Sequence, residues 1–249
     1  VMHYGGFACN MDKIMSIALK YNLKVVEDAA HSPAATYKGR YLGTIGDVSA
    51  FSFFANKNIS TAEGGMLVTK DDNLAEKAKL MRSHGMTSMS YERFKGHATN
   101  YDVLELGYNY RLDNIRSALG VAQLKRLAED IKRRRVLVGR YIENLNGING
   151  LIIPFMSKQE ESTNYIFPVI LARSCPIARE EVRNRLSEIG IQTSFHYPSA
   201  HEFSIYSKYH AKLPLTEYAA RREITLPLYY SMTLEQVDYV SDSLKRILE

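Results

Sequence analysis

The chain has 249 residues, of which 45% are hydrophobic and 24% charged, a composition typical of a soluble globular protein with one large domain or two unequal ones. Its 32 basic and 27 acidic residues give a net charge of +5 that is spread along the sequence, which argues against a nucleic-acid partner. Cys9 and Cys175 stand far apart without metal-binding spacing, and no membrane span or signal peptide is present in the sequence. We therefore expect a cytoplasmic protein with reduced thiols, no metal site and no membrane partner.

The first half of the sequence alternates predicted helices and strands, which indicates an α/β fold with a mostly parallel sheet. The opening VMHYGG resembles the end of a strand, so we expect the sequence to begin within a domain. Apolar spacing predicts a helix over 11–20 with Asn10 as its N-cap. Strands are expected at LKVVED and VSAFSFF, followed by a helix that begins after Asp71 or Asp72 and ends at Gly85.

The second half of the sequence predicts a smaller α+β unit. Residues 86–105 lack periodicity and predict a long loop, which is a candidate lid or substrate contact. A run of helix formers over 114–147 predicts a long helix or a bent pair that joins two domains. Beyond this run, strands are expected at YIFPVIL and IQTSFHYP, with helices at IAREEVRNRLSEIG and LEQVDYVSDSLKRILE. We place the large domain at 1–130 and the smaller C-terminal α+β domain at 131–249.

Polar residues follow two of the predicted strands at their carboxyl ends, where parallel α/β sheets bind ligands. Asp28 comes directly after the apolar pair Val25 and Val26, and His31 follows three residues later. Both side chains can face one pocket. Asp28 taken alone is equally consistent with a helix N-cap or a turn residue.

Lys57 follows the second of these strands and precedes small hydroxylated residues and the pair Gly64 and Gly65. A lysine that is held by a strand and shielded from water has a lowered pKa, and its neutral amine is a nucleophile. The alternative for a single lysine is an ordinary surface position in a loop. The accompanying acid, histidine and strand-end serine favour a reactive role.

These residue types match the needs of pyridoxal 5'-phosphate (PLP). The cofactor needs a lysine for its Schiff base, an acid beside its pyridine nitrogen, and hydroxyl or amide groups for its phosphate. Lys57, Asp28 and Ser52 can supply these three groups. A carboxylate beside the ring nitrogen favours the protonated ring, which accepts electrons.

Two longer segments resemble the signature segments of the DegT/DnrJ family of nucleotide-sugar aminotransferases, which are fold type I PLP enzymes. They are VVEDAAHSPAATYKGRYLGTIGDVSAFSFFANKNISTAEGGMLVT and LGYNYRLDNIRSALGVAQL, and the resemblance covers essentially the whole chain. It implies that Lys57 is the Schiff-base lysine, that Asp28 pairs with the pyridine nitrogen and that Ser52 binds the phosphate. It places His31 at the 3'-hydroxyl side of the ring. Asn109 resembles the residue that reaches the phosphate of the neighbouring subunit's cofactor, which implies a homodimer.

The resemblance also implies a substrate site. The segment TSFHYPSAH is similar to the family's substrate-side loop, so His196 and Tyr197 are candidates for a sugar or diphosphate contact, and Arg111 is a third candidate. His196 is also consistent with an ordinary strand-end histidine, and Arg111 with a brace for the turn into the next helix. Family members carry a further N-terminal segment before the position of Val1. We therefore expect a three-layer fold type I large domain that is incomplete at its N-terminus.

The function implied is a PLP-dependent aminotransferase that moves an amino group from L-glutamate to a keto group of a nucleotide-linked deoxysugar. Such a reaction serves amino sugar biosynthesis for a surface polysaccharide or a glycosylated metabolite. Lys57 favours the aminotransferases over the family's dehydratases, in which a histidine replaces the lysine. A non-catalytic remnant, a PLP-dependent sugar dehydratase and a cyclitol aminotransferase remain alternatives. A generic phosphate loop at AEGG is disfavoured, because its glycine spacing matches neither a P-loop nor a dinucleotide fingerprint.

Overall fold

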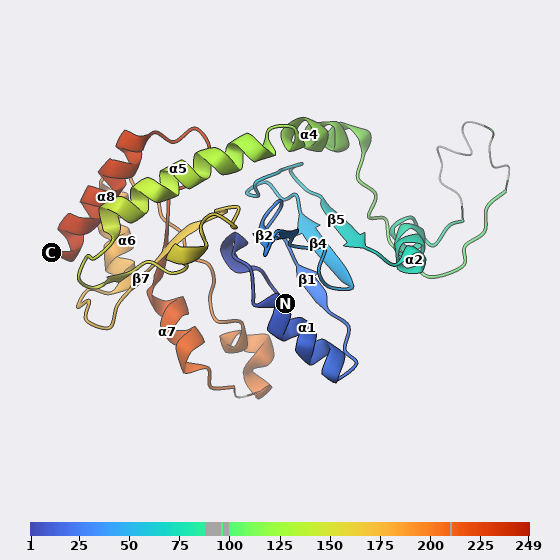
Figure 1. Cartoon of the computed structure of the whole chain (residues 1–249), viewed down its shortest axis with the longest axis horizontal. Helices are drawn as coiled ribbons and strands as arrows, with labels where there is room; N and C mark the ends of the chain where they lie inside the picture. The colour runs from blue at the N-terminus through green and yellow to red at the C-terminus, as the bar shows by residue number, and fades with distance from the viewer. Residues whose placement is uncertain (88–95, 97–99, 210) are drawn as a thin grey trace. The chain divides into compact units, whose positions relative to one another are not determined.

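The computed structural model describes residues 1–87, 96, 100–209 and 211–249 (Figure 1). The chain forms two compact units: unit 1 comprises Val1–Tyr4 and Ala8–Leu127, and unit 2 comprises Gly5–Phe7 and Ala128–Glu249. Most of the loop predicted at 86–105 lies outside the described residues. The predicted domain boundary at residue 130 stays a prediction.

In its described residues, unit 1 combines short strands with three helices. Its elements in chain order are α1 (Met11–Lys20), β1 (Val26–Asp28), β2 (Thr36–Tyr37), β3 (Arg40–Tyr41), β4 (Val48–Ser52), β5 (Gly65–Thr69), α2 (Asp72–Arg82) and α4 (Asn114–Leu124). The strands β2 and β3 form a small antiparallel hairpin. The larger sheet has the order β1-β4-β5.

The larger sheet of unit 1 contains both parallel and antiparallel pairs. β1 and β4 run parallel, with Asp28 aligned to Ala50, whereas β4 and β5 run antiparallel, with Ser52 opposite Gly65. Met2 forms a parallel bridge with Asp28 beside β1, as expected for a strand end at the start of the sequence. The predicted α/β fold class is confirmed.

Capping residues explain where the helices of unit 1 begin. Asn10 accepts a hydrogen bond from the Lys13 backbone N–H at 3.1 Å, and α1 has the predicted bounds. Asp71 caps α2 in the same way, through the Leu74 N–H at 3.1 Å. These side chains satisfy backbone donors that a helix leaves unpaired in its first turn. α2 ends at Arg82, before the predicted end, and the chain then turns.

Unit 2 packs helices around a second antiparallel sheet. Its elements are α5 (Leu127–Leu145), whose first residue belongs to unit 1, β6 (Leu151–Ile152), β7 (Phe167–Leu171), α6 (Arg179–Glu188), α7 (Pro214–Arg222), β8 (Glu223–Leu226) and α8 (Leu234–Leu248). Short 3-10 turns occur at Tyr4–Gly6, Met156–Lys158, Ala200–Glu202 and Ser204–Tyr209. The helical run over 114–147 forms a pair of helices, α4 and α5, which is one of the two forms that the sequence predicts.

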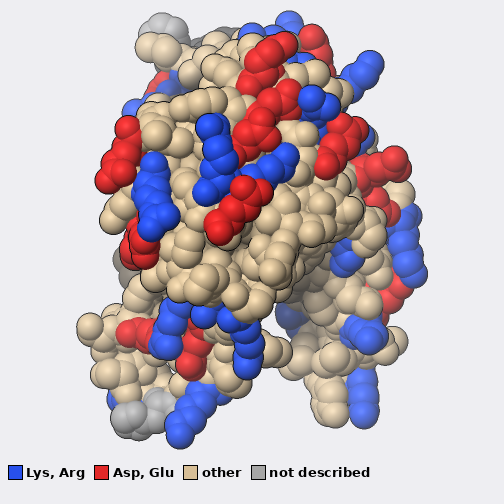
Figure 2. Space-filling view, turned by 90° about the vertical axis from the view of Figure 1, so that its left-hand side faces the viewer, with Lys and Arg blue, Asp and Glu red and all other residues tan. Residues whose placement is uncertain are grey.

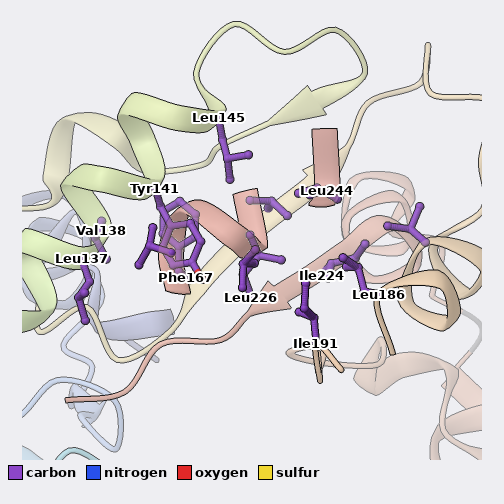
Figure 3. Packing of buried hydrophobic residues seen from close by; sticks show 14 of the residues in the cluster. Leu137, Val138, Tyr141, Leu145, Phe167, Leu186, Ile191, Ile224, Leu226 and Leu244 are labelled. Carbon is purple, nitrogen blue, oxygen red and sulfur yellow. The ribbon is translucent and has the colours of Figure 1, made fainter. Parts of the chain in front are cut away.

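The core of unit 2 lies between its sheet and the helices α5, α6 and α8 (Figure 3). The rings of Tyr141 and Phe167 stack there with centroids 4.7 Å apart. The Tyr141 hydroxyl donates to the Pro227 carbonyl at 2.9 Å, so its one polar atom is paired. Burying each large apolar side chain of this kind contributes about 1.5–3 kcal/mol, and this core therefore holds β7 and β8 in place.

The strand predicted at IQTSFHYP, residues 191–198, is not present. Ser194 alone bridges to Thr225, with backbone bonds of 3.2 and 2.9 Å in the two directions. The His196 N–H donates to the Glu223 carboxylate at 2.8 Å instead of to a strand carbonyl. The prediction was wrong because a buried side chain takes the backbone donor that would have extended the ladder.

The net positive charge is dispersed on the face that Figure 2 presents, where basic and acidic side chains are interspersed. Ion pairs of unit 2 include Arg140 with Asp238 at 2.6 Å and Lys245 with Asp242 at 3.1 Å. Exposed pairs of this kind contribute little to stability. In the described part of the chain, no helix is both long and apolar enough to cross a membrane.

Candidate functional site

Asp28 lies at the carboxyl end of β1, as the sequence predicts. One carboxylate oxygen accepts the Ala30 backbone N–H at 3.0 Å, which fixes the turn that follows the strand. The backbone N–H of Ala29, the residue directly after Asp28, donates to the Ala50 carbonyl of β4 at 2.9 Å. The carboxylate is therefore held at the edge where β1 and β4 both end.

Lys57 lies in the turn that follows β4. Its backbone N–H donates to the Phe54 carbonyl at 3.0 Å. Burial lowers the pKa of the Lys57 ammonium, and the Asp28 carboxylate partly opposes this shift by attracting the charge. The predicted lysine and the predicted acid therefore interact electrostatically, although they are separated by 28 residues in the sequence.

Ser52 and the glycine pair form the end of the β4–β5 hairpin. The Ser52 hydroxyl oxygen accepts the Phe54 N–H at 3.3 Å, and the Phe53 N–H donates to the Gly64 carbonyl at 2.9 Å. A Cβ at Gly64 would lie 2.4 Å from the Thr61 hydroxyl oxygen, at a φ of +156° that disfavours other residues. Glycine is therefore required where the loop after Lys57 folds back against the strand.

Two polar side chains next to the predicted site residues are buried without hydrogen-bond partners. They are the Ser32 hydroxyl, which follows His31, and both polar atoms of the Asn58 amide, which follows Lys57. His31 itself is buried. Buried polar groups nearly always have partners, so these atoms are candidates for contact with a bound polar group.

Glu27 anchors β1 from the inner side of the strand and was not predicted as a site residue. It is 0% exposed, and its Oε2 accepts the Gly43 N–H at 2.8 Å and contacts His3 Nε2 at 2.9 Å. Its Oε1 accepts the N–H groups of Ile45 and Gly46 at 2.7 and 2.6 Å. Burial favours the neutral acid, but the bonds from His3 and the three amides outweigh it and lower the pKa of Glu27 to about 2.

The sequence carried a signal for Glu27. Strand residues alternate between faces, and Val25 and Glu27 share the buried face, whereas Val26 is 55% exposed. An acid on the buried face of a strand needs several donors, which the loop over 43–46 supplies. We infer that this network fixes the end of β1 that carries Asp28.

Asn109 and Arg111 lie beside the end of α2. Asn109 is exposed and forms an isolated antiparallel bridge with Ser83. Arg111 is also exposed, and its guanidinium lies 3.4 Å from His84 Nε2. The roles predicted for these two residues stay predictions.

A groove of about 1790 Å³ crosses unit 1 between β5, α2 and residues 108–117. Arg111 and Gly64 line this groove, whereas Lys57 and Asp28 do not. The volume exceeds the range of about 300–1,000 Å³ that is usual for small-molecule sites. The groove therefore does not by itself identify the position of an active site.

His196 and Tyr197, the other predicted substrate residues, form an aromatic cluster within unit 2. Their ring centroids are 4.8 Å apart, and the Tyr165 ring lies 6.4 Å from His196. His196 Nδ1 lies 2.7 Å from the Thr225 hydroxyl oxygen. Thr225 was not predicted as a site residue, and its place beside His196 arises from the bridge between two distant segments.

An α/β unit with a part-buried lysine that interacts electrostatically with a carboxylate at the end of a strand has a candidate lysine-based active site. Residues 1–245 match the sequence profile of the DegT/DnrJ/EryC1/StrS aminotransferase family. The chain therefore belongs to this family, and the resemblance inferred from the sequence is confirmed.

The chain is similar to named sugar-modifying proteins. It is 37% identical over 243 residues to GDP-perosamine synthase of Escherichia coli O157:H7, covering 98% of this chain and 63% of that protein. The chain thus spans less than two thirds of the length of this relative.

Solved structures share the fold. Helicobacter pylori PseC, an aminotransferase involved in the biosynthesis of pseudoaminic acid, has a TM-score of 0.91 at 27% identity, covering 99% of this chain and 65% of that one. The PLP-form of the putative sugar aminotransferase Spr1654 from Streptococcus pneumoniae has a TM-score of 0.89 at 25% identity, covering 99% and 67%.

Proposed function

We propose that this chain binds PLP through Lys57 and that the protein moves an amino group from L-glutamate to a keto group of a nucleotide-linked deoxysugar. The reaction would serve amino sugar biosynthesis for a surface polysaccharide or a glycosylated metabolite. Two relatives support the substrate class, since one is named GDP-perosamine synthase and the other acts in pseudoaminic acid biosynthesis. The PLP-form of a third supports the cofactor.

The observation that carries this proposal is the part-buried position of Lys57 after β4, where burial lowers the pKa of its ammonium and the Asp28 carboxylate attracts its charge. An amine that loses its proton more readily is a better nucleophile toward the PLP aldehyde at neutral pH. The unpartnered polar atoms of Ser32 and Asn58 offer further hydrogen bonds to a polar ligand. The residues present in unit 1 therefore fit the cofactor.

Each predicted residue of unit 1 has a role in this proposal. PLP, when bound, supplies an electron-accepting ring that makes the α-proton of an amino acid removable. Asp28 would pair with the pyridine nitrogen, His31 would meet the 3'-hydroxyl side, and Ser52 would bind the phosphate. Lys57 Nζ would take the proton from the α carbon of the donor and return one to the keto carbon that receives the amino group.

The second substrate of the proposed reaction is the nucleotide-linked sugar. We assign His196, Tyr197 and Arg111 to the nucleotide-linked sugar. In this arrangement residues 1–130 form the cofactor-binding part and residues 131–249 the smaller C-terminal domain. The experiments below test the cofactor and the substrate separately.

The homodimer is part of the same proposal, with Asn109 directed to the partner subunit's cofactor. Apolar side chains exposed on one face of α4 support it: Ile115 is 85% and Leu119, four residues later, 46% exposed. Contiguous exposed apolar surface of this kind marks an interaction site. We expect Ile115→Lys to lower the mass measured by light scattering from dimer to monomer. Leu19→Lys, at an equally exposed position on α1, should leave the dimer intact, and a monomeric native chain would contradict the assignment.

An absorbance titration tests the cofactor site. Adding PLP to the native chain should produce the visible band of the lysine-bound cofactor, and borohydride should fix the added mass on the peptide that contains Lys57. Lys57→Ala should lose both signals, because the nucleophile is absent. Lys70→Ala, which removes an exposed lysine after β5, should keep them. A stable band in Lys57→Ala would refute the assignment.

Product analysis tests the reaction. The PLP-loaded protein is incubated with L-glutamate and candidate nucleotide-linked ketosugars, and 2-oxoglutarate and amino sugar should appear in equal amounts. Asp28→Asn should keep the cofactor but slow the single turnover strongly, because the ring nitrogen loses its charge partner. An unchanged rate in Asp28→Asn would contradict the role of this carboxylate.

A further inference from the structure

Two buried residues of β8 form a hydrogen-bonded chain that ends on His196. Glu223 and Thr225 are 4% and 6% exposed. The Thr225 hydroxyl donates to Glu223 Oε1 at 2.6 Å, and His196 Nδ1 lies 2.7 Å from the same hydroxyl oxygen. Glu223 Oε2 accepts the His196 backbone N–H at 2.8 Å. One carboxylate therefore contacts both the backbone of His196 and, through Thr225, its ring.

The protons of this chain assign the tautomer of His196. A threonine hydroxyl has one proton, which Thr225 donates to the Glu223 carboxylate. The Thr225 oxygen can therefore only accept from His196, so Nδ1 must carry a proton. In the neutral ring the lone pair then lies on Nε2.

We propose that Glu223 and Thr225 are positioning residues that fix His196 in the Nδ1–H tautomer, so that Nε2 accepts a hydrogen bond from a sugar hydroxyl. A diphosphate offers acceptors but no donors, so the neutral ring in this tautomer does not suit it. The contact with substrate rests on the function proposed above. The tautomer is a property of the chain alone.

The surroundings of Glu223 decide whether it can keep its negative charge. Burial raises the pKa of Glu223, and the hydrogen bonds from Thr225 and the His196 N–H act in the opposite direction, as do the charges of Arg179 and Arg183. Both arginines lie on α6, and both guanidiniums stack on the Phe195 ring, at 4.4 and 5.1 Å from its centroid. Burial outweighs these four interactions and leaves the pKa of Glu223 raised, so the proposal rests on the hydrogen-bond geometry with Glu223 in its ionised form.

The variant Glu223→Gln tests the proposal directly, because its amide fits in only one orientation. Its oxygen must face the His196 backbone N–H, since an NH₂ there would oppose another donor. Its NH₂ then donates to the Thr225 oxygen, and the threonine hydroxyl must turn and donate to His196 Nδ1. We therefore expect the tautomer to invert, with the proton on Nε2.

Nitrogen-15 NMR of the full chain measures the tautomer directly from two-bond couplings between the ring nitrogens and carbon-bound protons. At a pH where the ring is neutral, the native chain and Thr225→Ser should show Nδ1–H. Glu223→Gln should show Nε2–H, and Thr225→Val should lose the preference. The signals of His3 and His31 report whether each variant is folded. An Nε2–H tautomer in the native chain, or an Nδ1–H tautomer in folded Glu223→Gln, would overturn the proposal.

Binding measurements test the ligand class, with UDP-glucose against UDP and GDP-mannose against GDP as probes. Thr225→Val should weaken binding of the sugar-linked member of a pair about two- to tenfold, as expected for one lost hydrogen bond, and leave the nucleotide unchanged. Equal weakening of both members would overturn the sugar-hydroxyl contact. Native chain that binds neither pair would refute the proposed substrate class, whereas the NMR result would still decide the tautomer.

Discussion

Replacement of the buried carboxylate of Glu27 should change how the stability of the protein depends on pH. The carboxylate accepts three backbone N–H groups and contacts His3 Nε2 at 2.9 Å. Burial lowers the pKa of His3, but its interactions with Cys9 and Glu27 outweigh this effect and raise the pKa to about 9, so His3 Nε2 donates to Glu27. In Glu27→Gln, the NH₂ faces backbone N–H donors whichever way the amide is turned, so the network cannot be satisfied.

The size of the effect follows from the pKa. The carboxyl titrates at about 2 in the folded state, compared with 4.5 in the absence of structure. A lowered pKa stabilises the fold fully above pH 4.5, and this stabilisation is lost as the pH falls from 4.5 toward 2. Each pKa unit corresponds to about 1.4 kcal/mol, so Glu27 contributes about 3 kcal/mol at neutral pH. About 2 kcal/mol of this should be lost between pH 6 and pH 3.

Urea denaturation of the native chain and of Glu27→Gln at several pH values between 6 and 3 measures this contribution. The difference in the free energy of unfolding between the two chains should shrink by about 2 kcal/mol as the pH falls from 6 to 3, because Glu27 becomes protonated. Other carboxylates titrate in both chains, so their contribution cancels in this difference. The control Asp12→Asn removes an exposed carboxylate that pairs with Lys38. The difference in the free energy of unfolding between this variant and the native chain should stay small and should depend on salt. A difference between native and Glu27→Gln chains that does not vary with pH would refute the reasoning.

Further substitutions test the backbone and the core. Gly64→Ala should lower the free energy of unfolding by about 1–3 kcal/mol, because the new Cβ would lie 2.4 Å from the Thr61 hydroxyl. The control Gly139→Ala lies within α5 with nothing within 4 Å of the new Cβ, and should stabilise by about 0.5–1 kcal/mol in the same urea assay. Tyr141→Phe should cost about 0.5–1.5 kcal/mol in thermal unfolding, since the part-buried Pro227 carbonyl loses its donor at 2.9 Å. Equal stabilities for the two glycine variants, or an unchanged Tyr141→Phe, would contradict these assignments.

Local signals in the sequence predicted the helices well. The cap at Asn10 and the bounds of α1 agree with the structure, and α8 begins after Thr233 with a capping box that includes Gln236. A helix is stabilised by bonds between residues three and four apart, so its ends depend on nearby residues. The same reasoning identified Asp71 as one of two possible caps for α2.

Strands and buried acids were predicted less well. The apolar run at 191–198 looked like a strand, but Glu223, from a distant segment, takes the His196 N–H. Glu27 was passed over because its four partners come from two loops, around His3 and over 43–46. The partners of Glu27 and of the His196 N–H have no short-range signal in the sequence, since hydrogen bonds between distant residues are specified only when the chain has folded.

The sequence by itself determined the family, the α/β class and the residues that the resemblance assigns to the cofactor, because these depend on residue types at fixed spacing along the chain. Only the tertiary structure decided that Lys57 is buried enough for its pKa to fall beside Asp28, and that Thr225 meets His196. The physical reason is that desolvation and hydrogen bonding act through space over a few ångströms. They depend on which distant segments are packed together, which spacing along the chain does not specify.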